Sequence, residues 1–265
     1  MPNAIPWGDF ALRIGEHRYW QIGPLNFSLS RGRHDWTLQH WRDRDPESND
    51  LVVAQDTANE PPKNAPTASA TNTIRFQFAN SPTQLSVTPC LADRPFVIKP
   101  DAPLRLAAGE KVCFYVTTIM RLLFKHQDKL LLEIPVFDQQ ETWFGNFTQG
   151  ELCYASTTMA RTEFDDVPMR PYRPITPVTL SNKSNDALSV EQFKLPITFL
   201  SLYANPHGRL FTDGIDIICT KDGDEVDLRI SRDGNKRLTI DKTLADAREQ
   251  VDLRQRFDVE RFFRK

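Results

Sequence analysis

Two short stretches hold the residues with the clearest capacity for binding chemistry. The first runs from Thr142 to Tyr154 and places Trp143 and Phe144 beside glycine. An accessible indole ring binds a sugar or another flat ligand by stacking on its apolar face. The simpler interpretation is that Trp143 and Phe144 close the end of a β-sandwich.

The second stretch is a proline-rich loop that contains Arg161, Arg170 and Arg173. A guanidinium group clamps a carboxylate or a phosphate through two parallel hydrogen bonds. The competing interpretation is pairing with acidic neighbours in the same loop, namely Glu163, Asp165 and Asp166. Together the two stretches predict a ligand site near Trp143 and Arg173.

Trp36 and His40 form a further candidate pair. They lie four residues apart, so a strand would place both on one face. This pair either lines a ligand site or packs in the core.

Motifs of the main enzyme classes are not found in the sequence. The five histidines include no H-x-x-x-H pair, and no two of Cys90, Cys113, Cys153 and Cys219 have the short spacing of zinc ligands. No nucleophile elbow, P-loop or dinucleotide-binding glycine motif is present. We therefore predict no metal, no cofactor and no catalytic residue. Enzymatic activity stays open, because a glycosidase needs only two carboxylates and the chain has 35 acidic residues.

The charge and hydropathy limit the class of partner. A net charge of -2 argues against nucleic acid. No apolar run approaches the ~20 residues of a membrane-spanning helix. The first residues lack the basic and apolar regions of a secretory signal, so we expect a cytoplasmic protein with reduced thiols.

Alternating apolar and polar residues predict the elements that carry these side chains. Residues 173–196 contain two strands around a polar turn, and residues 98–116 repeat the pattern. Short strands are also predicted at 10–14, 19–22, 25–29 and 36–41. The ambiguous run 118–124 is assigned to a strand because its flanks are strands.

These patterns predict an all-β fold with two immunoglobulin-like antiparallel sandwich units. The first unit is expected over 1–135 and the second over 136–265. Residues 43–73 are poor in large apolar residues and are expected to be a mobile excursion. Residues 243–263 are rich in helix formers and lack glycine and proline, which predicts a C-terminal helix.

Several of these motifs resemble one uncharacterised prokaryotic family. They are Trp143-Phe-Gly, Gly150-Glu-Leu-Cys-Tyr-Ala-Ser156, Arg173-Pro-Ile-Thr-Pro-Val, Asn182 with Leu188, and Leu195-Pro with Leu200-Ser-Leu-Tyr203. The chain is similar to the family known as domain of unknown function four-three-two over nearly its whole length, apart from residues 43–73. The resemblance implies no established activity and assigns no functional residue. An association with genes beside small mechanosensitive channels makes a membrane-protein partner one option.

The leading hypothesis is a non-enzymatic module that binds a protein partner through sheet faces and the C-terminal helix. The alternative is an enzyme or sensor that binds a carbohydrate-like or anionic small molecule near Trp143 and Arg173. Self-association through an uncovered sheet edge is the third option.

Overall fold

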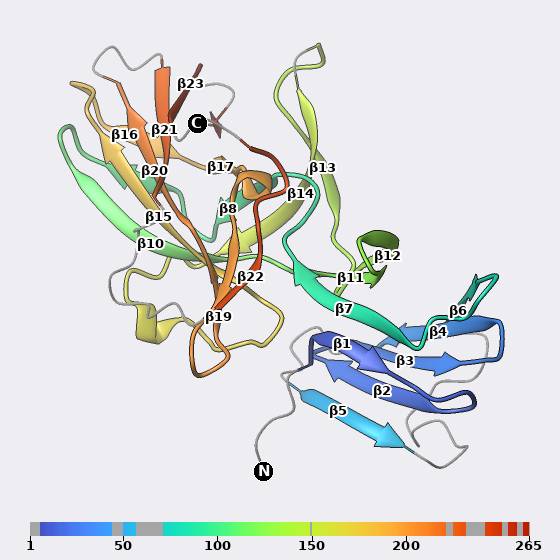
Figure 1. Ribbon diagram of the computed structural model, residues 1–265. Helices are drawn as coiled ribbons and strands as arrows, with labels where there is room; N and C mark the ends of the chain where they lie inside the picture. Colours follow the sequence, from blue (N-terminus) through green and yellow to red (C-terminus); the bar gives the residue numbers. More distant parts are fainter. Residues whose placement is uncertain are drawn as a thin grey trace. The chain divides into compact units, whose positions relative to one another are not determined.

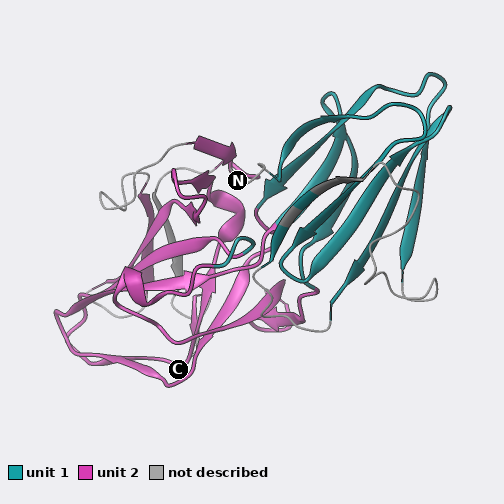
Figure 2. Cartoon of the chain, turned by 90° about the horizontal axis from the view of Figure 1, so that it is seen from below, with its two compact units in different colours: residues 1–90, 121–137, 170–172 teal, residues 91–120, 138–169, 173–265 magenta. Residues whose placement is uncertain are grey.

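A computed structural model describes residues 6–43, 50–56, 71–148, 150–220, 225–231, 242–250, 254–258 and 262–264 of the chain. Throughout these residues the fold is built from strands, as predicted, with two single-turn helices, η2 (Phe164–Asp166) and η3 (Ile197–Phe199). The chain divides into two compact units, which interleave in the sequence (Figures 1 and 2). Unit 1 comprises residues 1–90, 121–137 and 170–172, and unit 2 comprises 91–120, 138–169 and 173–265. The predicted division of the chain lies near residue 135.

Unit 1 contains two antiparallel sheets. One has the order β1 (Gly8–Ala11), β7 (Gln84–Cys90), β11 (Arg121–His126) and β12 (Lys129–Pro135). The other has the order β5 (Leu51–Asp56), β2 (His17–Ile22), β3 (Leu25–Arg31), β4 (Asp35–Arg42) and β6 (Asn72–Gln77). The assignment of 118–124 to a strand is correct from Arg121 onward. Within the expected excursion, β5 pairs with β2, while 44–49 and 57–70 lie outside the described residues.

Aromatic side chains join the two sheets of unit 1. Phe10 of β1 meets Trp20 of β2 edge-on at 4.9 Å, and Phe27 of β3 meets Phe124 of β11 at 5.3 Å between ring centroids. Trp20, Phe27 and Phe124 are fully buried. Such edge-to-face pairs add roughly 0.5–1.5 kcal/mol to the free energy of burial.

Unit 2 contains a large mixed sheet, a smaller mixed sheet and a two-stranded ribbon. The large sheet has the order β22 (Lys242–Ala245), β18 (Leu202–Ala204), β19 (Leu210–Thr212), β15 (Ile175–Asn182), β20 (Gly214–Cys219), β21 (Glu225–Ser231) and β23 (Arg254–Asp258), and β10 (Lys111–Thr117) also pairs with β15. The smaller sheet has the order β13 (Glu141–Phe144), β14 (Glu151–Thr158), β8 (Phe96–Pro100), β17 (Gln192–Leu195) and β24 (Phe263–Arg264). The ribbon pairs β9 (Leu104–Leu106) with β16 (Leu188–Val190).

The two segments that share the same predicted pattern, 98–116 and 173–196, pair with each other in the structure. Strands β8, β9 and β10 of the first segment run antiparallel to β17, β16 and β15 of the second. Phe114 of β10 packs edge-on against Phe193 of β17 at 5.7 Å between centroids. The two strands predicted on either side of the polar turn therefore exist, but they pair with residues far upstream, 58–70 positions away for β15 and 82–86 positions away for β16.

The predicted C-terminal helix over 243–263 is wrong. In its described part, this segment holds β22, β23 and the start of β24, which pair with β18, β21 and β17. Helix propensities differ by less than about 1 kcal/mol per residue, so tertiary context readily overrides them. Here the strands add to existing sheets, and Phe262 and Phe263 become buried.

Candidate functional site

The aromatic stretch that the sequence analysis selected forms the β13–β14 hairpin at one edge of the smaller sheet. The strands are antiparallel, and Trp143 lies directly opposite Leu152. In Figure 1 the hairpin is the yellow-green pair of strands labelled β13 and β14. A strand alternates its side chains between two faces, so the hairpin has an inner and an outer face.

The turn of the hairpin is organised by Asn146. Its side-chain oxygen accepts hydrogen bonds from the backbone N and the hydroxyl of Thr148, each at 3.2 Å. Its backbone oxygen accepts from Trp143 Nε1 at 3.1 Å and from Gly150 N at 2.8 Å. A Cβ atom at Gly150 would lie 2.3 Å from Trp143 Nε1, so glycine is required where the indole folds over the turn.

The inner face anchors the hairpin in unit 2. Phe144 of β13 and Cys153 of β14 form a buried cluster with Val97 of β8. Burial, and to a smaller extent the Glu151 carboxylate, raises the pKa of the Cys153 thiol to about 12. This thiol is therefore a packing group and not a nucleophile at neutral pH.

The outer face and the turn of the hairpin carry exposed apolar side chains. Trp143 is 46% exposed, Leu152 is 39% exposed, and Phe147 in the turn is 99% exposed. We call these three residues the hairpin patch. Cβ atoms that are directly opposite on paired strands are about 4.5–5.5 Å apart, so Trp143 and Leu152 form one apolar surface.

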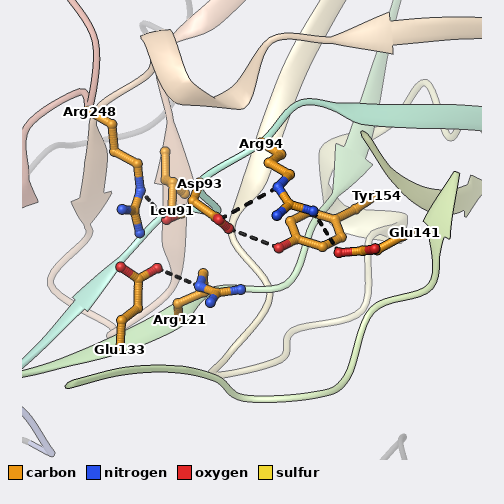
Figure 3. Close-up of polar contacts among 8 residues, drawn as sticks. All are labelled: Leu91, Asp93, Arg94, Arg121, Glu133, Glu141, Tyr154 and Arg248. Carbon is orange, nitrogen blue, oxygen red and sulfur yellow. Dashed lines mark hydrogen bonds and ion pairs between the residues drawn. The ribbon is translucent and has the colours of Figure 1, made fainter. Parts of the chain in front are cut away.

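Charged groups continue the same outer face. Glu141 and Tyr154 form the cross-strand pair two positions from Trp143 and Leu152. Arg94 Nη1 lies 2.6 Å from Glu141 Oε1, and its Nε lies 3.9 Å from Asp93 Oδ2. The Tyr154 hydroxyl donates to Asp93 Oδ1 at 2.9 Å (Figure 3). We call Asp93, Arg94, Glu141 and Tyr154 the charged row.

The charged row is held by the backbone around it. Tyr154 N donates to Pro95 O at 2.9 Å. Nearby in the same unit, Arg248 Nε donates to Leu91 O at 2.9 Å (Figure 3). The hydrogen bond to Glu141 raises the pKa of Arg94 above its usual value, so this guanidinium remains charged. Figure 3 also shows the Arg121–Glu133 ion pair, which belongs to unit 1.

The other site residues expected from the sequence are distributed over both units. Trp36, His40 and Arg170 belong to unit 1, whereas Trp143, Arg161 and Arg173 belong to unit 2. Trp36 and His40 share one face of β4, where both are buried, and Trp36 Nε1 donates to Pro82 O at 2.9 Å. Arg161 Nη2 lies 3.1 Å from the sulfur of Met159, and its backbone oxygen accepts from Tyr115 N. Arg170 and Arg173 are half-buried.

Sequence reasoning did not single out Phe147, Leu152 or the charged row. The alternation of apolar and polar residues on the two sides of the glycine-rich turn could have predicted that Trp143 pairs with Leu152. No comparable signal connects Asp93 and Arg94 with Glu141, because they lie more than 40 residues upstream and come near only through β8.

A metal centre and a membrane-spanning helix are both absent from the residues that the structure describes. There, no three His, Cys, Asp or Glu side chains are grouped so as to hold a metal ion. No helix among those residues is long and apolar enough to cross a membrane.

Comparison with known protein families gives a match over almost the whole chain. The model of the family described as "Protein of unknown function (DUF432)" matches residues 6–263. No curated protein and no solved structure matches the chain.

Proposed function

Since the chain belongs to the DUF432 family, whose description assigns no function, we propose a function from the hairpin patch. The protein is a binding module that docks a second, different protein on Trp143, Phe147 and Leu152. The proposal assigns no catalytic step to this surface.

The observation that carries this proposal is the exposure of three large apolar side chains on one hairpin. Burying apolar surface contributes about 25 cal/mol per Å², so a partner that covers the patch removes an unfavourable contact with water. Tryptophan is also among the residues that most often dominate the binding energy of protein interfaces.

The packing of the inner face gives further support. Phe144 and Cys153 are buried, and the Asn146 hydrogen bonds hold the turn and the indole in place. A surface that is already ordered pays little conformational entropy when it binds. The hairpin is therefore suited to present its patch without refolding.

Photo-crosslinking from the patch tests the proposal. Phe147 is replaced by p-benzoylphenylalanine, which changes folding little because its side chain is 99% exposed. Irradiation in native cells should give a covalent adduct with one defined protein. The same change at Ile14, an exposed apolar residue of unit 1, is the matched control and should not give that adduct.

The adduct must also depend on the rest of the patch. Trp143→Ser combined with Leu152→Ser should reduce its yield at least ten-fold while the far-ultraviolet circular dichroism spectrum stays unchanged. Equal yields from positions 147 and 14, or an adduct between two copies of this chain, contradict the proposal.

A small-molecule site is the alternative, and the half-exposed indole of Trp143 is the observation that favours it. A carbohydrate-like or anionic ligand near Trp143 and Arg173 should raise the melting temperature of the native chain. That shift should disappear in Trp143→Ala and in Arg173→Ala. If it survives both changes, the ligand binds elsewhere.

Three finer features are part of the proposal. They are immunoglobulin-like sandwich units, a cytoplasmic location and a membrane protein as one class of partner. A tagged pull-down that includes the membrane fraction identifies the class of partner.

A further inference from the structure

The outer face of the hairpin has charge as well as apolar surface, and the two lie in a fixed order. The Glu141–Tyr154 pair follows the Trp143–Leu152 pair at a spacing of two residues. A strand rises about 3.3 Å per residue, so the charged row begins roughly 7 Å from the centre of the patch. A single partner segment therefore contacts both.

The charged row has a net negative charge. Asp93 and Glu141 are the carboxylates of the charged row, and Arg94 is its cation. The Glu141 side chain is 53% exposed, while the Arg94 side chain is 36% exposed and faces both carboxylates. Glu141 lies on this outer face, whereas Glu151 lies opposite Phe144 on the inner face and pairs with Lys194.

Glu141 is able to accept a further donor without losing Arg94. An ionised carboxylate has about four acceptor positions, and the Arg94 ion pair is made to one of its oxygens. An acidic partner residue beside Glu141 would be repelled by the carboxylates of Asp93 and Glu141, and Arg94 already pairs with both of them.

We propose that the partner segment on the hairpin patch is apolar and basic, with large apolar side chains on Trp143 and Leu152 and a lysine or arginine on Glu141. This inference rests on the proposed function and adds the chemical class of the partner. The same charges disfavour an anionic membrane surface, which attracts basic residues and not glutamates.

The charged row contributes to the choice of partner more than to the affinity. Exposed ion pairs add little affinity, whereas like charges at an interface select against the wrong partner. Removing the charge should thus have a smaller effect than removing the patch.

Selection of peptides on the full chain tests the inference. A phage-displayed library of random dodecapeptides is selected on the immobilised protein, and binding of the enriched peptides is measured by fluorescence anisotropy. We expect peptides with at least two large apolar residues and an enriched lysine or arginine. Trp143→Ser should weaken their binding more than ten-fold.

Charge substitutions then examine Glu141. Glu141→Gln should weaken the basic peptides about three-fold and Glu141→Lys about ten-fold, and a peptide with glutamate in place of its lysine should regain affinity for the Glu141→Lys variant. Glu110→Lys is the matched control, because Glu110 is an exposed carboxylate of unit 2 outside the hairpin, and it should change binding less than two-fold.

The outcomes separate the inference from the proposed function. One outcome overturns the inference and leaves the proposed function standing. In it, the selected peptides need Trp143 for binding, but they are not enriched in lysine or arginine and bind the Glu141 variants as tightly as the native chain. If no enriched peptide depends on Trp143, both fail. Trp143-dependent sedimentation with phosphatidylcholine or phosphatidylglycerol vesicles also overturns the inference, because the occupant is then a membrane.

Discussion

At the scale of single residues, Asn182 connects segments of unit 2 that are distant in the sequence. Its side-chain nitrogen donates to the backbone oxygens of Leu106, Ala107 and Asp186 at 2.8–3.1 Å. Its side-chain oxygen accepts from Ser184 N and Oγ at 3.1 and 2.7 Å. The side chain is buried, so these groups lose contact with water if it is removed.

We expect Asn182→Ala to lower the free energy of unfolding by about 2–4 kcal/mol, because several part-buried backbone groups lose their hydrogen-bond partner. Urea denaturation followed by fluorescence measures this change. Asn205→Ala is the matched control, since Asn205 Oδ1 also accepts two backbone hydrogen bonds but from a more exposed turn. A loss no larger than that of the control would contradict the role assigned to Asn182.

The cysteines give a prediction that depends on pH. Cys113 is exposed, whereas burial and the Glu151 carboxylate raise the pKa of Cys153 to about 12. At pH 8, a thiol reagent should modify Cys113 in the native protein and leave Cys153 unmodified, as read by mass spectrometry. Cys113→Ser should remove the fast reaction. Equal rates at the two residues would show that Cys153 is accessible.

The same pKa shift has a consequence for stability. An unfolded chain loses its thiol proton near pH 8.5–9, and the folded chain does so near pH 12. The contribution of Cys153 is therefore complete below about pH 8.5 and is lost as the pH rises toward 12. Cys153→Ala should make unfolding less sensitive to pH in this window.

At the scale of elements, Arg209 holds the loop between β14 and β15. Its Nη2 donates to Val167 O at 2.6 Å and to Phe164 O at 3.3 Å, and its guanidinium carbon lies 4.0 Å from the centroid of the Phe164 ring. Phe164 in turn contacts Tyr115 of β10 edge-on at 5.5 Å. Burial lowers the pKa of Arg209, and the Asp165 carboxylate acts in the opposite direction.

Arg209→Lys should loosen this loop, because an ammonium group does not provide the planar fork that bonds Val167 and Phe164 and stacks on the ring. We expect cleavage by trypsin after Arg161 to become several-fold faster. Arg105→Lys, at an exposed position of β9, should leave the rate unchanged. Equal rates for both variants would contradict the anchoring role.

At the scale of the whole chain, strand pairing crosses residue 135. Strand β8 pairs with β14 and β17, and β10 pairs with β15. Each pairing joins a strand before residue 135 with one after it. The stability of unit 2 therefore depends on both halves of the sequence, and its long-range pairings predict slow folding.

We accordingly expect the separate fragments 1–135 and 136–265 to give poorly dispersed amide NMR spectra, because β8 to β10 lose their partners. Co-expression of the two fragments should restore a dispersed spectrum, which controls for the cut itself. A dispersed spectrum from 136–265 alone would instead support the division near residue 135.

The sequence by itself determined the class of fold and the family. Period-two alternation indicated strands, as at 19–22 and 36–41, because burial of one sheet face imposes that pattern directly on neighbouring residues. The sequence also pointed to Trp143, since a tryptophan beside glycines is a local feature.

Only the tertiary structure decided which strands pair and which side chains meet. Val178 lies beside Phe114 and Ile215, and Arg94 meets Glu141, through contacts that no local pattern encodes. The C-terminal segment could not be predicted from local pattern either, because its helix-forming residues pair as strands with β18 and β21 of unit 2. Local propensities amount to tenths of a kcal/mol per residue, whereas strand pairing and burial of Phe262 and Phe263 contribute several kcal/mol, so the long-range terms prevail.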